Sequence, residues 1–172
     1  MMKKLIYFCE GETEQKFIKV LKEEFLIKPG QVKIFNLMQK NINSIIRKYK
    51  SSNSEFVFII DIDTINKDIF CSNIKILKKH KYKFCLFIQN KNFEDELALC
   101  CNKNNKLALY KDFYNINSSN EFKSKFISDN SLYLKLINNS FDITKLWLLT
   151  NFNIQCYNNL NICNRNGFLK EN

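Results

Sequence analysis

The chain has 172 residues, of which 45% are hydrophobic and 14% aromatic, which is enough apolar side chain for one domain with its own core. Its formal charge of +10 favours nucleic acid or another polyanion as a partner. A Lys-rich surface from an AT-rich genome explains the charge alone equally well. No run reaches the roughly 20 apolar residues that cross a membrane, so we expect no membrane partner.

The cysteines indicate the cellular compartment. Seven are present, none in a Cys-x-x-Cys pair, and His80 is the one histidine, so a structural zinc site is not expected. An odd number of cysteines, several in apolar runs, predicts reduced thiols in a cytoplasmic protein. Glu10 interrupts the first apolar run, which leaves that run too short for a signal peptide.

The first two thirds of the chain alternate short apolar runs with amphipathic helical patterns. The apolar runs predict strands over residues 5–9, 32–37, 55–60 and 83–89. A helix over 13–26 follows the first strand, with Thr13 as its cap, and Asn66 is expected to cap the helix after the third strand. Strands that alternate with helices in this way build a mainly parallel sheet.

Beyond residue 90 the apolar residues recur at helical spacing only. We therefore predict an α/β fold with a sheet of about four strands, mainly parallel and flanked by helices, and a helical C-terminal portion. The domain is predicted over residues 1–150, with a core over about 3–100 and a helical addition over about 101–150. Residues 151–172 are Asn-rich and weakly patterned, which predicts a polar tail.

Two acidic motifs follow predicted strands. Glu10 ends the first apolar run, and Asp61 and Asp63 end the third. The carboxyl ends of parallel strands form the ligand crevice of open α/β sheets, and residues two apart in an extended chain face the same side. Clustered carboxylates need a cation, and oxygen ligands suit Mg²⁺ or Mn²⁺. By contrast, Glu14 is fully explained by the start of a helix, where a carboxylate suits the helix dipole.

Further candidates are less specific. Glu94 follows the fourth strand and could join the acidic site, although an acidic first helical turn explains it equally well; Glu96 replaces it if the helix begins elsewhere. Lys145 and Lys123 are candidate cations near the site, although a surface role is the commoner one for any single lysine. The basic residues Lys16, Arg47, Lys48 and Lys50 are candidates for phosphate contacts that carry no sequence information.

The order of the acidic motifs resembles the Toprim fold, a Rossmann-like metal-binding domain with a Glu after its first strand and an Asp-x-Asp after a later one. The run Glu10-Gly11-Glu12-Thr13-Glu14 is most similar to the Glu-Gly-x-Thr-Glu of RloB-like and OLD-family Toprim nucleases. The resemblance covers roughly residues 3–100. The sequence contains no Gly-x-x-x-x-Gly-Lys-Ser/Thr motif, so it resembles a stand-alone Toprim protein.

This resemblance implies a Mg²⁺- or Mn²⁺-dependent endonuclease that cleaves phosphodiester bonds in RNA or DNA. Glu10, Asp61, Asp63 and Lys145 would be catalytic, with Glu94 as a further metal ligand and Glu10 alternatively a general acid or base. Similar proteins take part in prokaryotic defence against phage. An alternative is a metal- and nucleic-acid-binding subunit that needs an ATPase partner. A phosphotransferase or nucleotide-sugar enzyme would leave Glu10 unexplained.

Overall fold

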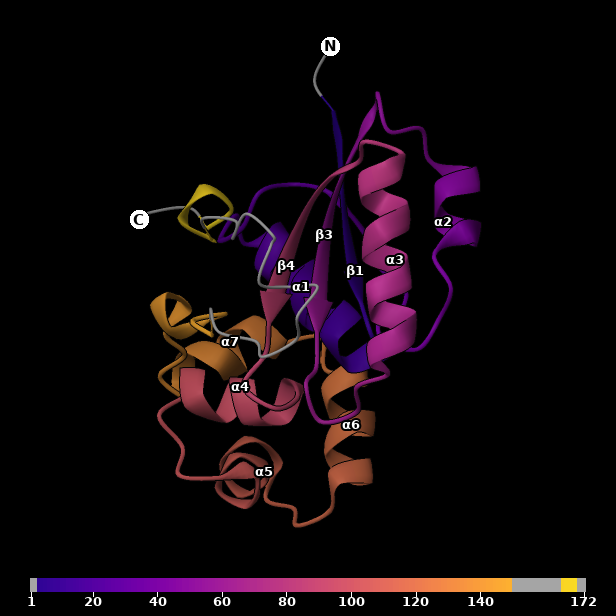
Figure 1. Ribbon diagram of the computed structural model, residues 1–172. Helices are drawn as coiled ribbons and strands as arrows, with labels where there is room; N and C mark the ends of the chain where they lie inside the picture. Colours follow the sequence, from indigo (N-terminus) through magenta and orange to yellow (C-terminus); the bar gives the residue numbers. More distant parts are fainter. Residues whose placement is uncertain (1–2, 150–164, 170–172) are drawn as a thin grey trace.

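The computed structural model describes residues 3–149 and 165–169. At its centre is a four-stranded, all-parallel sheet with the strand order β2-β1-β3-β4 (Figure 1). The strands are β1 (Lys4–Cys9), β2 (Gln31–Ile34), β3 (Ser54–Ile60) and β4 (Lys83–Ile88). The predicted α/β class with four parallel strands flanked by helices is therefore confirmed.

Helices cover both faces of this sheet and extend beyond its lower edge (Figure 1). They are α1 (Glu12–Glu23), α2 (Asn43–Lys48), α3 (Lys67–Lys79), α4 (Phe93–Cys100), α5 (Lys106–Tyr114), α6 (Ser119–Ser128) and α7 (Leu132–Asn138). Short 3-10 helices occupy Ile143–Lys145 and Arg165–Gly167. The helical C-terminal portion is therefore confirmed.

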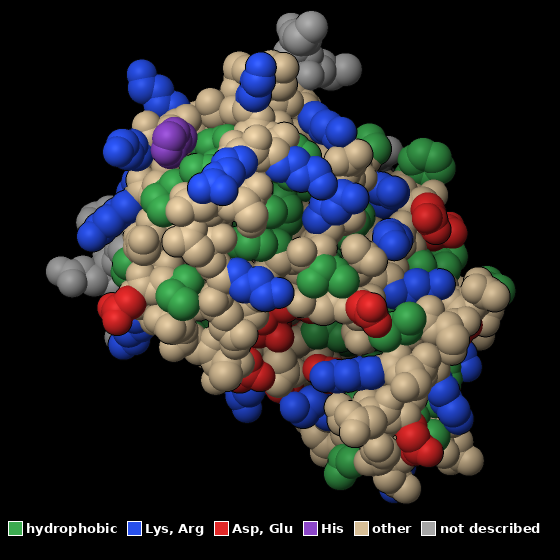
Figure 2. Space-filling view, turned by 90° about the vertical axis from the view of Figure 1, so that its right-hand side faces the viewer, with side chains coloured by type: hydrophobic (Ala, Val, Ile, Leu, Met, Phe, Trp, Pro, Cys, Tyr) green, Lys and Arg blue, Asp and Glu red, His purple; other side chains and the backbone are tan. Residues whose placement is uncertain are grey.

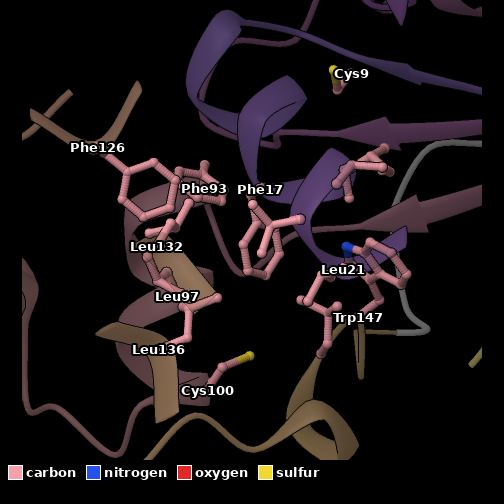
Figure 3. Close-up of a cluster of buried hydrophobic side chains, with 14 of the residues drawn as sticks. Cys9, Phe17, Leu21, Phe93, Leu97, Cys100, Phe126, Leu132, Leu136 and Trp147 are labelled. Carbon is pink, nitrogen blue, oxygen red and sulfur yellow. The ribbon is translucent and has the colours of Figure 1, made fainter. Parts of the chain in front are cut away.

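The strands divide their side chains between two cores, because successive residues of a strand point to opposite faces. Ile6 and Phe8 pack with the residues of α2 and α3, whereas Tyr7 and Cys9 pack with α1 and the C-terminal helices. Figure 3 shows the second core, in which Phe17 of α1 faces α4 and α7. The C-terminal helices thus share the core of the sheet.

Several sequence predictions change in detail. β2 ends at Ile34 and not at residue 37, because the side chain of Asn36 accepts bonds from the Met38 and Gln39 N–H groups and turns the chain. Gly11 is the N-cap of α1, so the prediction of Thr13 as its cap is wrong. Asn66 caps α3 by accepting from the Ile69 N–H, as predicted.

The segment predicted as a polar tail lies mostly outside the described residues. Its described part, 165–169, packs on the domain. Phe168 is buried against Phe87, with ring centroids 5.3 Å apart, and its carbonyl accepts from the Lys28 N–H at 2.9 Å. Arg165 also donates to the Leu146 carbonyl, and Leu169 forms an isolated bridge with Ile27, so contacts from several residues hold this short segment.

The cysteine prediction holds only in part. Cys9, Cys100 and Cys101 carry free, buried thiols, but Cys71 and Cys85 are disulfide-bonded. The prediction of reduced thiols is wrong for those two, because a sequence pattern predicts burial but not which sulfur atom the fold places alongside. The cytoplasmic location stays a prediction. Within the described ranges, no helix is long and apolar enough to cross a membrane.

Candidate active site

The site lies where the chain connections leave the sheet in opposite directions. β1 and β3 are neighbours; α1 follows β1 and packs on one face, while α3 follows β3 and packs on the other. This arrangement opens a crevice at the carboxyl ends of the two strands. Glu10 and Asp61 are the first residues after β1 and β3, so the topology places both in that crevice.

The two motifs meet directly although 51 residues separate them. The backbone N–H of Asp61 donates to Glu10 Oε1 at 3.3 Å. The other oxygen of Glu10 accepts from Asn36 Nδ2 at 2.5 Å. Asn36 comes from the loop after β2, and its side-chain oxygen Oδ1 accepts from the backbone N–H groups of Met38 and Gln39. Glu10 is therefore oriented by groups from two neighbouring strand ends.

Glu14 joins the same cluster from the first turn of α1. One of its oxygens accepts from the Gly11 N–H at 2.6 Å, as expected of a residue at a helix start. With the Gln89 amide oriented so that its nitrogen faces the carboxylates, that nitrogen donates to the other oxygen of Glu14 at 3.0 Å and also to Asp61 Oδ1. Gln89 follows β4 and is buried. Its amide thus holds two carboxylates that would otherwise repel each other.

Burial and mutual repulsion shift the ionisation of these carboxyl groups. Burial is the main cause of a rise in the pKa of Asp61 to about 9, and the charges of Glu14, Glu10, Asp63 and Glu94 add to it. Burial likewise raises the pKa of Glu14 to about 8 and that of Glu10 to about 7. A nearby cation would reverse this effect, because it favours the charged form of each group.

Asp63 and Glu94 stand at the edges of the cluster. Asp63 is exposed and accepts from Thr64 Oγ1 at 2.8 Å and Asn92 Nδ2 at 3.2 Å. The chain bends after Asp61, so the extended geometry predicted for the Asp61–Asp63 pair is wrong, and the two side chains differ in burial. Glu94 is buried in α4, and its Oε1 lies 3.2 Å from Lys123 Nζ of α6.

The structure also separates the two acidic candidates of α4. Glu96 is buried, and it accepts from the Asn90 N–H at 2.7 Å and from the Trp147 N–H. Burial raises the pKa of Glu96, and these two N–H groups oppose that rise. Glu96 therefore ties the loop after β4 to the C-terminal part of the domain, whereas Glu94 interacts with the acidic cluster.

The candidate lysines are separated as well. Lys123 pairs with Glu94. Burial lowers the pKa of Lys123, but the charge of Glu94 outweighs that effect and raises it, with a smaller contribution from Asp61. Lys145 donates to Asn102, which follows the other end of α4. The lysine predicted as catalytic is thus placed away from the carboxylates, and the alternative one is placed beside them. The sequence around Lys123 and Lys145 predicts a helix in both cases and does not indicate which of the two lies near the carboxylates.

The predicted phosphate-contacting residues do not gather around the cluster. Lys50 precedes β3, and its carbonyl accepts from the Asn53 N–H. It therefore lies at the amino ends of the strands, whereas Asp61 lies at their carboxyl ends. Arg47 and Lys48 are exposed in α2 on the way to that edge. Lys16 lies in the second turn of α1 and is half-buried.

Asn36, Gln89 and the second role of Glu14 were not predicted. A signal existed for the two amides, because each lies close after a strand that ends at the same edge of the sheet as Glu10 and Asp61. Amides are missed when a metal site is predicted from charged residues alone. Glu14 was missed because its helix-start role explained it completely.

The donor set suits a hard divalent cation, since Glu10, Glu14, Asp61, Asp63 and Glu94 offer only oxygen atoms. Among residues 3–149 and 165–169, however, no three His, Cys, Asp or Glu side chains converge closely enough to hold a metal ion as they stand. The carboxylates are neighbours, with Gln89 between two of them. Binding of an ion would require side chains to turn toward it.

No family model, curated protein or solved structure matches this chain. The fold and site define an α/β protein with an acidic crevice at the point where the direction of its sheet connections reverses. Its function therefore has to be argued from that crevice.

Proposed function

We propose that this chain is a stand-alone Toprim-type nuclease that cleaves phosphodiester bonds in RNA or DNA with Mg²⁺ or Mn²⁺. The observation that carries the proposal is the meeting of Glu10 and Asp61 at the carboxyl ends of adjacent parallel strands, with Glu14 and Glu94 beside them. Burial raises the pKa values of Asp61, Glu14 and Glu10, which is a costly arrangement for a purely structural role and is typical of functional sites.

Glu10, Asp61 and Asp63 would hold the metal, with Glu94 as a further ligand. A bound divalent ion would supply polarisation of the phosphoryl oxygens and activation of a water molecule. The chain itself supplies the positioning. Asn36 orients Glu10, and the Asp61 N–H donates to the same carboxylate. These contacts restrict the side chains that a metal and a phosphate would meet.

Lys123 replaces Lys145 as the proposed cation of the site. Its Nζ lies 3.2 Å from Glu94 Oε1 on one side of the cluster. From there an ammonium group can attract a substrate phosphate toward the carboxylates, whose own charge would otherwise repel it. A hydrogen-bonding cation also stabilises negative charge that develops on the phosphoryl oxygens during cleavage.

The test is cleavage of labelled RNA and DNA by the purified protein with Mn²⁺ or Mg²⁺. Glu10→Gln and Asp61→Asn should each abolish cleavage, while Glu121→Gln, an exposed change in α6, should retain it. Variants that cleave as fast as the wild type would exclude the proposed site. If cleavage is found, protection of a prokaryotic host against phage would test the proposed role as a defence effector.

One observation favours the second candidate, a metal- and nucleic-acid-binding subunit that acts with an ATPase partner. The described carboxylates are not arranged to hold an ion without side-chain movement, as expected of a site that a partner completes. This candidate predicts that Mn²⁺ binds and stabilises the isolated protein without cleavage. Cleavage should then appear when an ATPase encoded by a neighbouring gene is added.

A further inference from the structure

The positive charge of the chain is concentrated in one segment. Residues 40–83, which contain α2, β3 and α3, carry 10 Lys and Arg and 4 Asp and Glu, a formal charge of 10 − 4 = +6. Residues 84–149 carry 8 Lys and Arg and 7 Asp and Glu, a formal charge of 8 − 7 = +1. Codon bias in an AT-rich genome would enrich lysine throughout the chain and does not predict this asymmetry.

The excess charge lies on the surface of one layer. Lys75 and Lys79 are exposed, and they are four residues apart in α3 and therefore share one side of that helix. Arg47 is exposed on α2, which lies beside α3 in Figure 1. Figure 2 views this layer and shows Lys and Arg side chains over its upper part, with acidic side chains gathered in a hollow below them.

Ion pairing distinguishes this layer from the C-terminal helices. In the C-terminal part, Lys103 pairs with Asp112, Lys106 with Asp95 and Lys123 with Glu94. Within residues 40–83, Lys83 pairs with Glu55 near the start of β3. Among the described residues, Lys75, Lys79 and Arg47 take part in no ion pair, so their charges are available to a ligand from solution.

The direction of α3 connects this surface with the candidate active site. The helix begins at Lys67, shortly after Asp63, and runs back along the sheet toward the amino ends of the strands (Figure 1). Its 13 residues span about 20 Å at 1.5 Å per residue. That length covers several successive phosphates of one nucleic-acid strand, which follow one another about every 3.4 Å along the axis of a duplex.

The chemistry of the surface favours a phosphate backbone over a membrane. The exposed stripe of α3 that contains Lys75 and Lys79 also contains Asp68 and Ser72, and none of these side chains is apolar. A membrane-binding helix would interleave large apolar side chains with the basic ones. Phosphate contacts need only the charges and carry no sequence information.

We infer that the outer surface of α2 and α3 is the track along which the backbone of a nucleic-acid substrate lies, with Lys75, Lys79 and Arg47 contacting its phosphates. This inference rests on the proposed function for the identity of the substrate. The inference specifies which face of the protein binds the polyanion and in which direction. The nucleic-acid strand runs from the acidic hollow along α3 toward α2.

The experiment measures binding of a fluorescein-labelled DNA duplex and a single-stranded RNA, each about 20 nucleotides long, by anisotropy in EDTA. Without a divalent ion, binding is separated from metal binding and cleavage. The Lys75→Glu/Lys79→Glu variant should bind the duplex about 60-fold more weakly at about 0.1 M salt, because each lost phosphate contact is worth about 0.9 in the slope of log K against log salt. The slope should fall by about 1.8 for the duplex and about 1.4 for the RNA.

The matched control is Lys111→Glu/Lys125→Glu, which makes the same change of net charge at exposed positions of α5 and α6. It should keep most of the affinity and the wild-type slope. Equal losses in both variants would show that binding follows net charge alone and would overturn the inference. So would wild-type protein that binds neither nucleic acid, or that binds anionic vesicles through Lys75 and Lys79 instead. Thermal unfolding of both variants verifies that they are folded.

If the wild type binds but no protein cleaves with Mn²⁺, the nuclease proposal fails and the binding track stands. If the wild type cleaves and the α3 variant binds normally, the track fails and the nuclease proposal stands.

Discussion

Replacing Asp61 by Asn should make the metal-free protein more stable at alkaline pH. Burial raises the pKa of Asp61 to about 9 from its ordinary value of 3.8. Between these values the folded protein holds a proton at this side chain that the unfolded chain has released. The contribution of Asp61 to the stability of the fold is therefore fully present below the pKa of the unfolded chain. It is lost as the pH rises through the pKa of the folded protein. Asn is neutral at every pH, so the variant avoids that loss.

The magnitude follows from one proton. Each proton that the folded state binds in excess changes the free energy of unfolding by about 1.4 kcal/mol per pH unit. The stability of the wild type should therefore fall more steeply than that of Asp61→Asn, by about 1.4 kcal/mol per unit. Between about pH 5 and pH 8 the difference between the two proteins should shift by about 4 kcal/mol in favour of the variant. Asn can still accept the hydrogen bond that Gln89 donates.

The assay is urea unfolding in EDTA at several pH values, with Asp112→Asn in α5 as a matched change at an exposed carboxylate outside the cluster. The control should run parallel to the wild type. Adding Mn²⁺ at pH 8 to about 100 times its dissociation constant should stabilise the wild type by about 2.7 kcal/mol and Asp61→Asn much less. Equal pH slopes for the wild type and Asp61→Asn would refute the reasoning that Asp61 is held protonated by its surroundings.

Three other substitutions test residues that the structure singles out. Glu96→Ala leaves the N–H groups of Asn90 and Trp147 without their acceptor, so urea unfolding should show a loss of about 2–4 kcal/mol; a loss below about 0.5 kcal/mol would contradict the linking role. Asn73→Ala removes the acceptor of the Ile42 N–H and two bonds to backbone carbonyls from a fully buried position, and a lowered melting temperature with a loss of about 3 kcal/mol is expected. Lys123→Met should reduce cleavage at least about 10-fold because a cation beside the phosphate is lost, whereas the matched Lys145→Met should cleave like the wild type; the reverse order would restore Lys145 as the site lysine.

Much of the fold was predictable from local patterns. Apolar runs separated by amphipathic stretches are enough to predict four parallel strands, because strands buried on both faces must be apolar throughout. The same patterns placed Glu10 and Asp61 at strand ends. Since parallel strands end at one edge of a sheet, their meeting followed once β1 and β3 were neighbours. The sequence did not determine the order of the strands in the sheet, which is β2-β1-β3-β4.

The remaining site residues depended on tertiary structure. Glu14 satisfies a helix start by itself, and only the packing of α1 against the sheet turns its second oxygen toward Gln89. Lys123 and Lys145 are equivalent as sequence, but α6 is packed where Lys123 reaches Glu94. Local sequence determines which residues are charged and where elements begin. Which charges meet depends on contacts between elements far apart in the chain, and only the folded structure decides them.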